Sequence, residues 1–358
     1  MTSGKDVILV TGSSGFIGNR LVERLAERAA VVGLDVKEPA QLPDNASFVQ
    51  LDLTSDEAVA QALDTVREMH GERIASVVHL AAYFDLSGEP DPLYDEVTVR
   101  GTERLLRGLR KFEVEQFIYS STMLVHAPGE PGERITEDRP LMRKFPYRDS
   151  KIETEALVRE RRGSIPVVYF RPAGVYDDLC HSAFLAHQIA RTYERSPKSH
   201  VYPGDLGTAQ SFIHVEDLVD ALVRLIECRR ELPEELELLV GEPEAVPYEA
   251  LQRQIGRLLH DEDWQVWQVP KALAKSGAWL EDKTMGEHSF VKPWMVDAAD
   301  DDYTLDPTRA KDLLDWQPQH TLHESLPKMI QALKDDPAGW YAANGLDTGR
   351  LDLPKERF

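Results

Sequence analysis

A short apolar run near the N-terminus, Val7-Ile8-Leu9-Val10, leads directly into a turn that contains three glycines, Gly12, Gly15 and Gly18. The turn opens a helix-like pattern that extends to about Ala29. Four consecutive apolar residues, mostly β-branched, are typical of a strand buried on both faces. Glycines between such a strand and a helix let the backbone turn tightly and approach a pyrophosphate at the helix N-terminus. The sequence therefore predicts a dinucleotide-binding unit, although the spacing G-x-x-G-x-x-G differs from the commonest fingerprint.

Strand-like and helix-like segments continue to alternate up to about Val175. This rhythm predicts a doubly wound parallel sheet of the α/β class, with ligands at the carboxyl ends of the strands. The expected strands cover residues 7–10, 30–35, 47–49, 76–80, 116–120 and 166–170, and the expected helices cover 16–29, 57–69, 93–111 and 147–161.

Beyond Val175 the alternation weakens, and helical patterns cover residues 181–194, 215–229, 248–259 and 308–314. We therefore expect a Rossmann-like NAD-binding domain over 1–175. A smaller, mostly helical substrate lobe over 176–340 should be interleaved with it. Residues 341–358 are expected to form a tail, and the chain after Asp336 to lie on the surface or to fray.

The formal net charge of −21 argues against nucleic acid and anionic membranes as partners, because both bind clustered lysines and arginines. This acidity fits either salt adaptation or an ordinary solvated surface. No apolar run is long enough to span a bilayer, and no secretory signal pattern follows Met1. Cys180 and Cys228 match no metal-ligand spacing, and neither do His181 and His187. We expect a cytoplasmic protein with reduced thiols and no metal.

Two acidic residues are candidates for contacts with an adenosine. Asp35 ends the second expected strand, where a carboxylate accepts hydrogen bonds from both ribose hydroxyls and repels a 2′-phosphate. This favours NAD over NADP, although Lys37 nearby weakens the preference. Asp52 fits either a contact to the adenine amino group or an acid near a helix N-cap.

Tyr147 and Lys151 lie four residues apart within an expected helix, and so on one face of it. A tyrosine that takes a proton from an alcohol must form a phenolate, and its reference pKa is about 10. A nearby ammonium group favours the phenolate. A Y-x-x-x-K pair is common by chance, but its place after the fifth strand of a nucleotide-binding sheet favours an acid–base pair.

Taken together, these segments resemble the extended short-chain dehydrogenase family, also called the NAD-dependent epimerase/dehydratase family, over nearly the whole chain. The matching motifs are TGSSGFIG at 11–18, HLAA at 79–82, GT at 101–102, YSST at 119–122, the Tyr147–Lys151 pair, RPAGVY at 171–176, FIHVED at 212–217, DPTRA at 306–310 and LDWQP at 314–318.

The resemblance implies a role for each site residue. Tyr147 would exchange the hydroxyl proton, and Lys151 would hold the nicotinamide ribose and lower the tyrosine pKa. Thr122 would orient the substrate oxygen, with Ser121 as the alternative, and NAD would take or give the hydride. The residues implied in cofactor binding are Gly12, Ser14, Gly15, Phe16, Ile17, Gly18, Asp35, Asp52, Leu53, Leu80, Ala81, Ala82, Ser120, Tyr147, Lys151, Pro172 and Val175.

Departures from the family pattern narrow the chemistry. Family dehydratases and decarboxylases place acids after the catalytic Ser or Thr, whereas Met123 and Leu124 stand there in this chain and cannot transfer protons. Gly174 replaces an asparagine that helps many sugar-nucleotide enzymes to bind a diphosphate. Gln210 replaces an arginine that commonly binds phosphate.

The pair Tyr83-Phe84 follows the cofactor loop, where it would stack on a substrate ring or pack beneath the lobe. The candidate substrate residues are thus Tyr83, Phe84, Met123, Gly174 and Gln210.

Three functions fit these observations. The whole-chain pattern favours an NDP-sugar epimerase that works by transient hydride transfer. The lost phosphate contacts and the aromatic pair favour an NAD(P)-dependent dehydrogenase or reductase of a non-nucleotide alcohol or ketone, like a hydroxysteroid dehydrogenase. An NAD-binding regulatory module without catalysis is the third, and the intact Thr122, Tyr147 and Lys151 argue against it. We expect a small-molecule substrate and, as is usual in the family, a homodimer formed through residues 93–111 and 147–161.

Overall fold

A computed structural model describes residues 5–85, 87–130, 132–276 and 291–352. Its centre is a parallel sheet of seven strands in the order β13-β8-β7-β5-β1-β2-β3. The strand order reverses beside β1, which pairs with β2 on one side and β5 on the other. Such a reversal opens a crevice at the carboxyl ends of the strands. The strands are β1 (Val7–Thr11), β2 (Ala30–Asp35), β3 (Ala46–Gln50), β5 (Ser76–His79), β7 (Phe117–Ser120), β8 (Val167–Pro172) and β13 (Glu235–Val240).

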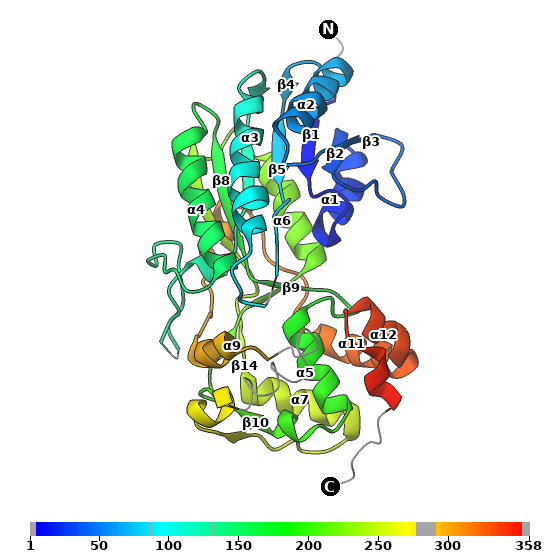
Figure 1. The fold of residues 1–358 in the computed structure, drawn as a ribbon, viewed down its shortest axis with the longest axis vertical. Coiled ribbons are helices and arrows are strands. Elements are labelled where there is room, and N and C mark those ends of the chain that lie inside the picture. Colours follow the sequence, from blue (N-terminus) through cyan, green and yellow to red (C-terminus); the bar gives the residue numbers. More distant parts are fainter. Residues whose placement is uncertain (1–4, 86, 131, 277–290, 353–358) are drawn as a thin grey trace.

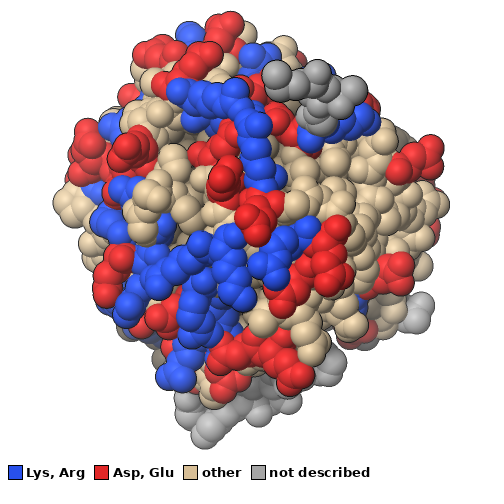
Figure 2. All heavy atoms as spheres, turned by 90° about the horizontal axis from the view of Figure 1, so that it is seen from above, with Lys and Arg blue, Asp and Glu red and all other residues tan. Residues whose placement is uncertain are grey.

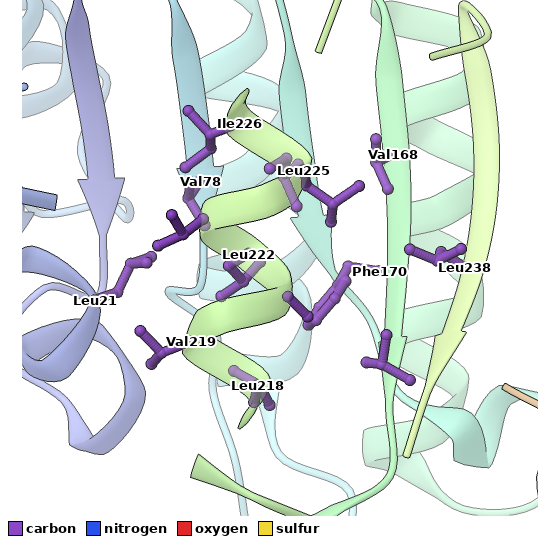
Figure 3. Packing of buried hydrophobic residues seen from close by; sticks show 14 of the residues in the cluster. Leu21, Val78, Val168, Phe170, Leu218, Val219, Leu222, Leu225, Ile226 and Leu238 are labelled. Atoms are coloured by element: carbon purple, nitrogen blue, oxygen red, sulfur yellow. The ribbon is translucent and has the colours of Figure 1, made fainter. Parts of the chain in front are cut away.

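Helices cover both faces of this sheet. On one face, α1 (Phe16–Ala26) and α6 (Val215–Glu227) enclose a hydrophobic cluster with the strands. Figure 3 shows α6 over the sheet, with its leucines among Val78, Phe170 and Leu238 of the strands. The opposite face is covered by α2 (Asp56–His70), by α3 (Arg100–Leu109) and by α4 (Pro146–Arg161). A π-helical turn, η1 (Tyr94–Val99), precedes α3.

The helical lobe lies below the sheet in Figure 1, where the strands end. Its helices α5 (Ala183–Tyr193), α7 (Tyr248–His260), α11 (Leu322–Asp335) and α12 (Pro337–Ala343) share a third hydrophobic cluster. Further short elements are β4 (Arg73–Ile74), β6 (Glu113–Val114), η2 (Met123–Val125), β9 (Gly174–Tyr176), η3 (Pro197–His200), β10 (Val201–Tyr202), β11 (Ala209–Gln210), β12 (Phe212–His214), β14 (Val246–Pro247), β15 (Trp267–Gln268), α9 (Pro293–Asp297), η5 (Ala298–Asp300), α10 (Thr308–Leu314) and η6 (Thr348–Asp352).

The structure confirms the predicted fold class and corrects two expectations. The helix predicted over residues 215–229 packs as α6 on the sheet and not in the lobe, and β13, which no sequence pattern predicts, extends the sheet at its edge. The chain after Asp336 does not fray at its start, because α12 buries Trp340 and Tyr341 in the lobe. The Tyr341 hydroxyl also donates a 2.9 Å hydrogen bond to Glu194.

The surface carries mixed charge despite the net negative balance. Figure 2 shows Lys and Arg side chains gathered among acidic ones on the end of the sheet that lies away from the lobe. Between β6 and β7, Glu115 forms ion pairs with Arg73, Arg229 and Arg230. Among the described residues, no helix is both long and apolar enough to cross a bilayer.

Candidate active site

The glycine-rich turn between β1 and α1 has the tight geometry that its glycines predict. Gly12 has φ of +70° and its N–H donates to Leu34 O at 2.9 Å. A Cβ there would lie 2.9 Å from Ala81 N, and one on Gly18 would overlap the Gly12 carbonyl. No side chain caps the start of α1 at Gly15. The first amides of α1 therefore have no side-chain acceptor. These amides lie beside a turn that requires glycines, and this arrangement fits the binding of a pyrophosphate.

Asp35 ends β2 next to this turn. Its carboxylate accepts the Ser14 N–H at 3.0 Å and the Lys37 N–H at 3.3 Å. A cavity of about 420 Å³ lies beside Ser14, lined by residues 14–16, by Asn19, Arg20 and Glu23 of α1 and by residues 39–41. Asp35 is thus held against the glycine turn through Ser14, and its contact with an adenosine ribose stays a prediction.

Asp52 is already engaged within its own loop. It accepts hydrogen bonds from the backbone and the hydroxyl of Thr54, at 2.8 and 2.7 Å, and these bonds lower its pKa. This geometry fits the interpretation of Asp52 as an acid near a helix N-cap, and its contact with adenine stays a prediction. Leu53 is buried nearby.

The loop after β5, residues 80–82, is held by Thr11 at the end of β1. The Ala81 N–H donates to the Thr11 hydroxyl at 3.2 Å, and Leu80 N–H donates to the Thr11 carbonyl at 3.2 Å. This loop therefore lies against the glycine turn, as the cofactor assignment of Leu80, Ala81 and Ala82 requires. Pro172 ends β8, and Val175 lies in β9, which pairs with β12.

Tyr147 and Lys151 lie one turn apart near the start of α4, which begins with Pro146 at a position that suits proline. The Lys151 ammonium lies 5.9 Å from the centre of the Tyr147 ring and donates to Ser120 O at 2.7 Å. Thr122 lies two residues after the end of β7, and its side chain lowers the pKa of Tyr147 through a hydrogen bond. The structure thus brings the three predicted catalytic residues together from two elements.

Burial sets the protonation of this group. It raises the pKa of Tyr147 to about 12, against a smaller lowering by Thr122. It lowers the pKa of Lys151 to about 8, while the Glu155 carboxylate acts in the opposite direction. The reserve candidate, Ser121, has a buried hydroxyl without a hydrogen-bond partner in the described structure.

The predicted substrate residues lie in different surroundings. Phe84 is 58% exposed and meets the Tyr147 ring edge-on, with ring centres 5.0 Å apart. Tyr83 instead donates to Asp91 at 2.9 Å and packs against Tyr94. Met123 is buried beside Thr122.

Gly174 and Gln210 lie in two short strands at the edge of the lobe. Gly174 belongs to β9, which pairs with β12, and Gln210 belongs to β11, which pairs with β14. The Phe212 ring fills the space beside Gly174, since a Cβ there would lie 3.1 Å from Phe212 Cδ1. Gln210 lies in β11 and pairs with Val246 and Tyr303. Neither residue is in contact with Tyr147 through any described interaction.

An aromatic pair at the start of α4 could not be found from the sequence. Phe145 occupies the N-cap position of α4, two residues before Tyr147. Its ring stacks on Trp294 with ring centres 4.6 Å apart. Trp294 also lies directly against Gly88, in the loop that follows Phe84. Phe145 and Trp294 are 149 residues apart in the chain, so only the fold brings them together.

A buried ion pair supports α4 from behind. Arg171 in β8 binds Glu155 through two hydrogen bonds, at 2.7 and 3.0 Å, and both side chains are almost fully buried. Glu155 lies one turn beyond Lys151. In the sequence, the spacing of four residues places Glu155 on the same helix face as Lys151, but it does not identify Arg171 as the partner of Glu155.

The chain matches a family model described as the NAD dependent epimerase/dehydratase family over residues 8–241. It is 31% identical to human 3 beta-hydroxysteroid dehydrogenase type 7 over 214 residues, which cover 53% of this chain and 54% of that protein. It is 25% identical to a UDP-glucose 4-epimerase of Mycolicibacterium smegmatis over 349 residues, or 91% of this chain and 98% of that one. The first curated relatives, of short-chain dehydrogenase/reductase family 42E, are matched over only about 60% of their own length.

Solved structures share the fold. A dTDP-glucose 4,6-dehydratase of Bacillus anthracis in complex with NAD superposes with a TM-score of 0.70 at 21% identity, covering 94% of this chain and 99% of that one. At this identity the likeness concerns the architecture, and it agrees with the sheet order described above.

Proposed function

The chain belongs to the NAD-dependent epimerase/dehydratase family, and we propose that it is an enzyme that interconverts a secondary alcohol and a ketone through Thr122, Tyr147 and Lys151. The cofactor of this family is NAD, and the residues present fit it. Gly12 and Gly18 let the turn pack closely against the 80–82 loop and the start of α1, as a pyrophosphate-binding turn requires, and Asp35 stands at the end of β2.

Each residue has one task in the proposed reaction. Bound NAD supplies the acceptor or the donor of the hydride. Tyr147 exchanges a proton with the substrate oxygen, and Thr122 holds that oxygen by a hydrogen bond. With a pKa near 8, Lys151 carries a positive charge at neutral pH, and this charge favours the Tyr147 phenolate.

For the substrate we propose an alcohol on an apolar ring system. The observation that carries this proposal is Phe84, an exposed aromatic side chain in edge contact with the ring of Tyr147. Phe145, two residues before Tyr147, stacks on Trp294 with ring centres 4.6 Å apart, so the start of α4 carries a second aromatic contact. Exposed aromatic rings next to a reacting group favour a flat, apolar ligand.

An NDP-sugar epimerase is the second candidate. It is supported by the UDP-glucose 4-epimerase match, which spans nearly all of both chains. Against it, neither Gly174 nor Gln210 offers a positive charge to a diphosphate.

Turnover and ligand binding together separate the two candidates. NAD⁺-saturated protein should produce NADH with a hydroxysteroid and should not be stabilised against heat by UDP, dTDP or GDP. Phe84→Ala should raise the KM for the steroid about tenfold, since an apolar ring contact of roughly 1.5 kcal/mol is lost. Phe184→Ala, another partly exposed phenylalanine, should leave the KM unchanged. Stabilisation by one nucleotide without steroid turnover would decide for the epimerase.

A further inference from the structure

A short turn of the substrate lobe lies against the cofactor end of the sheet. Residues 177–181, called here the 177–181 turn, connect β9 to α5 at the junction of sheet and lobe (Figure 1). The ring of His181 packs on Phe16, the first residue of α1, with ring centres 5.1 Å apart. Asp177 forms a 2.9 Å ion pair with Arg20, whose guanidinium lies 4.4 Å over the same phenylalanine ring. Four side chains thus join the lobe to the glycine-rich turn.

The backbone of this turn is held in an unfavourable conformation. Cys180 and His181 have φ of +89° and +37°, a region that non-glycine residues rarely adopt. Asp177 and Cys180 exchange two backbone hydrogen bonds, at 3.1 and 2.9 Å. Such strain persists only where the surroundings impose it, and it gathers at ligand sites.

The lobe supplies those surroundings through its last two helices. Lys328 of α11 pairs with Asp178 at 3.0 Å. Asn344, the residue that follows α12, donates to Leu179 O at 3.0 Å. The position of His181 beside Phe16 is therefore fixed from the C-terminal part of the chain.

His181 has one nitrogen held and the other available. Its Nδ1 lies 2.8 and 2.9 Å from the two Asp177 oxygens. An ionised carboxylate only accepts hydrogen bonds, so Nδ1 carries the hydrogen. Across the described chain, no hydrogen bond is found for Nε2, and the side chain is 26% exposed. As an imidazolium, His181 would donate from Nε2 to a phosphate oxygen.

Arg20 is less available to an anion than His181. Its guanidinium is engaged by Asp177 at 2.9 Å, by Glu216 at 3.8 Å and by the Phe16 carbonyl at 2.9 Å. The two carboxylates offset its positive charge, and all three acceptors fix its direction. Arg20 therefore acts on the site by holding Asp177 and Phe16.

We propose that His181 is a further binding residue for the pyrophosphate of NAD, contributed by the substrate lobe and positioned by Asp177. The amides at the start of α1 approach the pyrophosphate from the sheet, and His181 approaches it from the lobe. This proposal rests on the NAD dependence of the family and not on the identity of the alcohol. The proposal also implies that the affinity for NAD depends on the position of the substrate lobe relative to the sheet.

The test measures NADH binding by fluorescence, with ADP-ribose and adenosine as competitors. His181→Asn removes the imidazole, and asparagine tolerates positive φ, so the turn should keep its backbone. A lost charge-assisted hydrogen bond should weaken NADH and ADP-ribose about tenfold. Adenosine, which has no phosphate, should compete equally with both proteins. Asp177→Asn should produce a smaller loss of the same kind, because the ring is kept but less well oriented.

His323→Asn is the matched control, a histidine on the exposed face of α11. It should bind all three ligands like the wild type. His181→Asn protein that binds NADH and ADP-ribose within about twofold of wild type would overturn the proposal, as would an equal loss for adenosine. Binding is read without turnover, so a wrong assignment of the substrate leaves this result interpretable.

Discussion

The hydroxyl of Tyr147 is held in its protonated form by its surroundings. Burial raises its pKa to about 12, and the nearby Thr122 offsets only part of this shift. A protonated tyrosine suits the donation of a proton to a ketone oxygen near neutral pH, whereas oxidation of the alcohol needs the phenolate. The reduction direction should therefore tolerate neutral pH better than the oxidation direction.

Tyr147→Phe removes this hydroxyl and keeps the ring that Phe84 contacts. Turnover should fall by at least about 10²-fold in both directions, the usual contribution of a positioned acid or base. NADH binding, measured by fluorescence, should stay within about twofold of wild type because the ring remains in place. Near-normal turnover of this variant would remove Tyr147 from the chemistry.

At the scale of elements, a buried carboxyl joins the end of β13 to the start of α11. Glu242 is 3% exposed and accepts the Leu322 N–H at 2.8 Å, while its Oε1 has no hydrogen-bond partner in the described structure. Burial raises its pKa to about 7 from a reference value of 4.5. Because the folded state binds this proton more tightly than the unfolded chain, the contribution to stability is complete below pH 4.5. It is lost as the pH rises towards 7.

Glu242→Gln should remove this pH dependence, because the amide keeps an acceptor for Leu322 N–H and carries no charge. The wild type should lose up to about 3 kcal/mol relative to the variant over that pH range. Urea unfolding of both proteins at several pH values measures the difference. A difference in unfolding free energy that does not grow with pH would show that Glu242 titrates normally.

At the scale of the whole molecule, the sequence predicted what depends on local periodicity. The six expected strands follow from short apolar runs, and the Tyr147–Lys151 pair follows from a spacing of four residues within a helix. The seventh strand, β13, was missed because Glu235 and Glu237 interrupt its apolar pattern. In the fold Arg159 of α4 pairs with both of these acids.

Contacts between distant segments lay beyond such patterns. The Phe145–Trp294 stack and the His181–Phe16 contact each join residues more than a hundred positions apart. The homodimer expected through α3 and α4 stays a prediction. The outer faces of these helices carry charged residues, among them Arg100, which pairs with Asp95, and Arg161, near Glu103.

The last described α-helix, α12, makes the lobe depend on Tyr341, which the sequence assigns to a tail. Tyr341 is fully buried among α5, α7 and α11, and its hydroxyl donates to Glu194. Tyr341→Ala should lower the free energy of unfolding by about 3 to 5 kcal/mol through the cavity it leaves. Tyr341→Phe, which loses only the hydrogen bond, should cost about 1 kcal/mol.

Urea unfolding of both variants provides the measurement, with Leu313→Ala as a control because Leu313 is 41% exposed. A Tyr341→Ala variant as stable as Leu313→Ala would mean that the core of the lobe packs without the contribution of α12. Since Asn344 also holds the 177–181 turn, a destabilised α12 should in addition weaken NADH binding. Loss of stability with unchanged NADH affinity would separate the lobe core from the cofactor site.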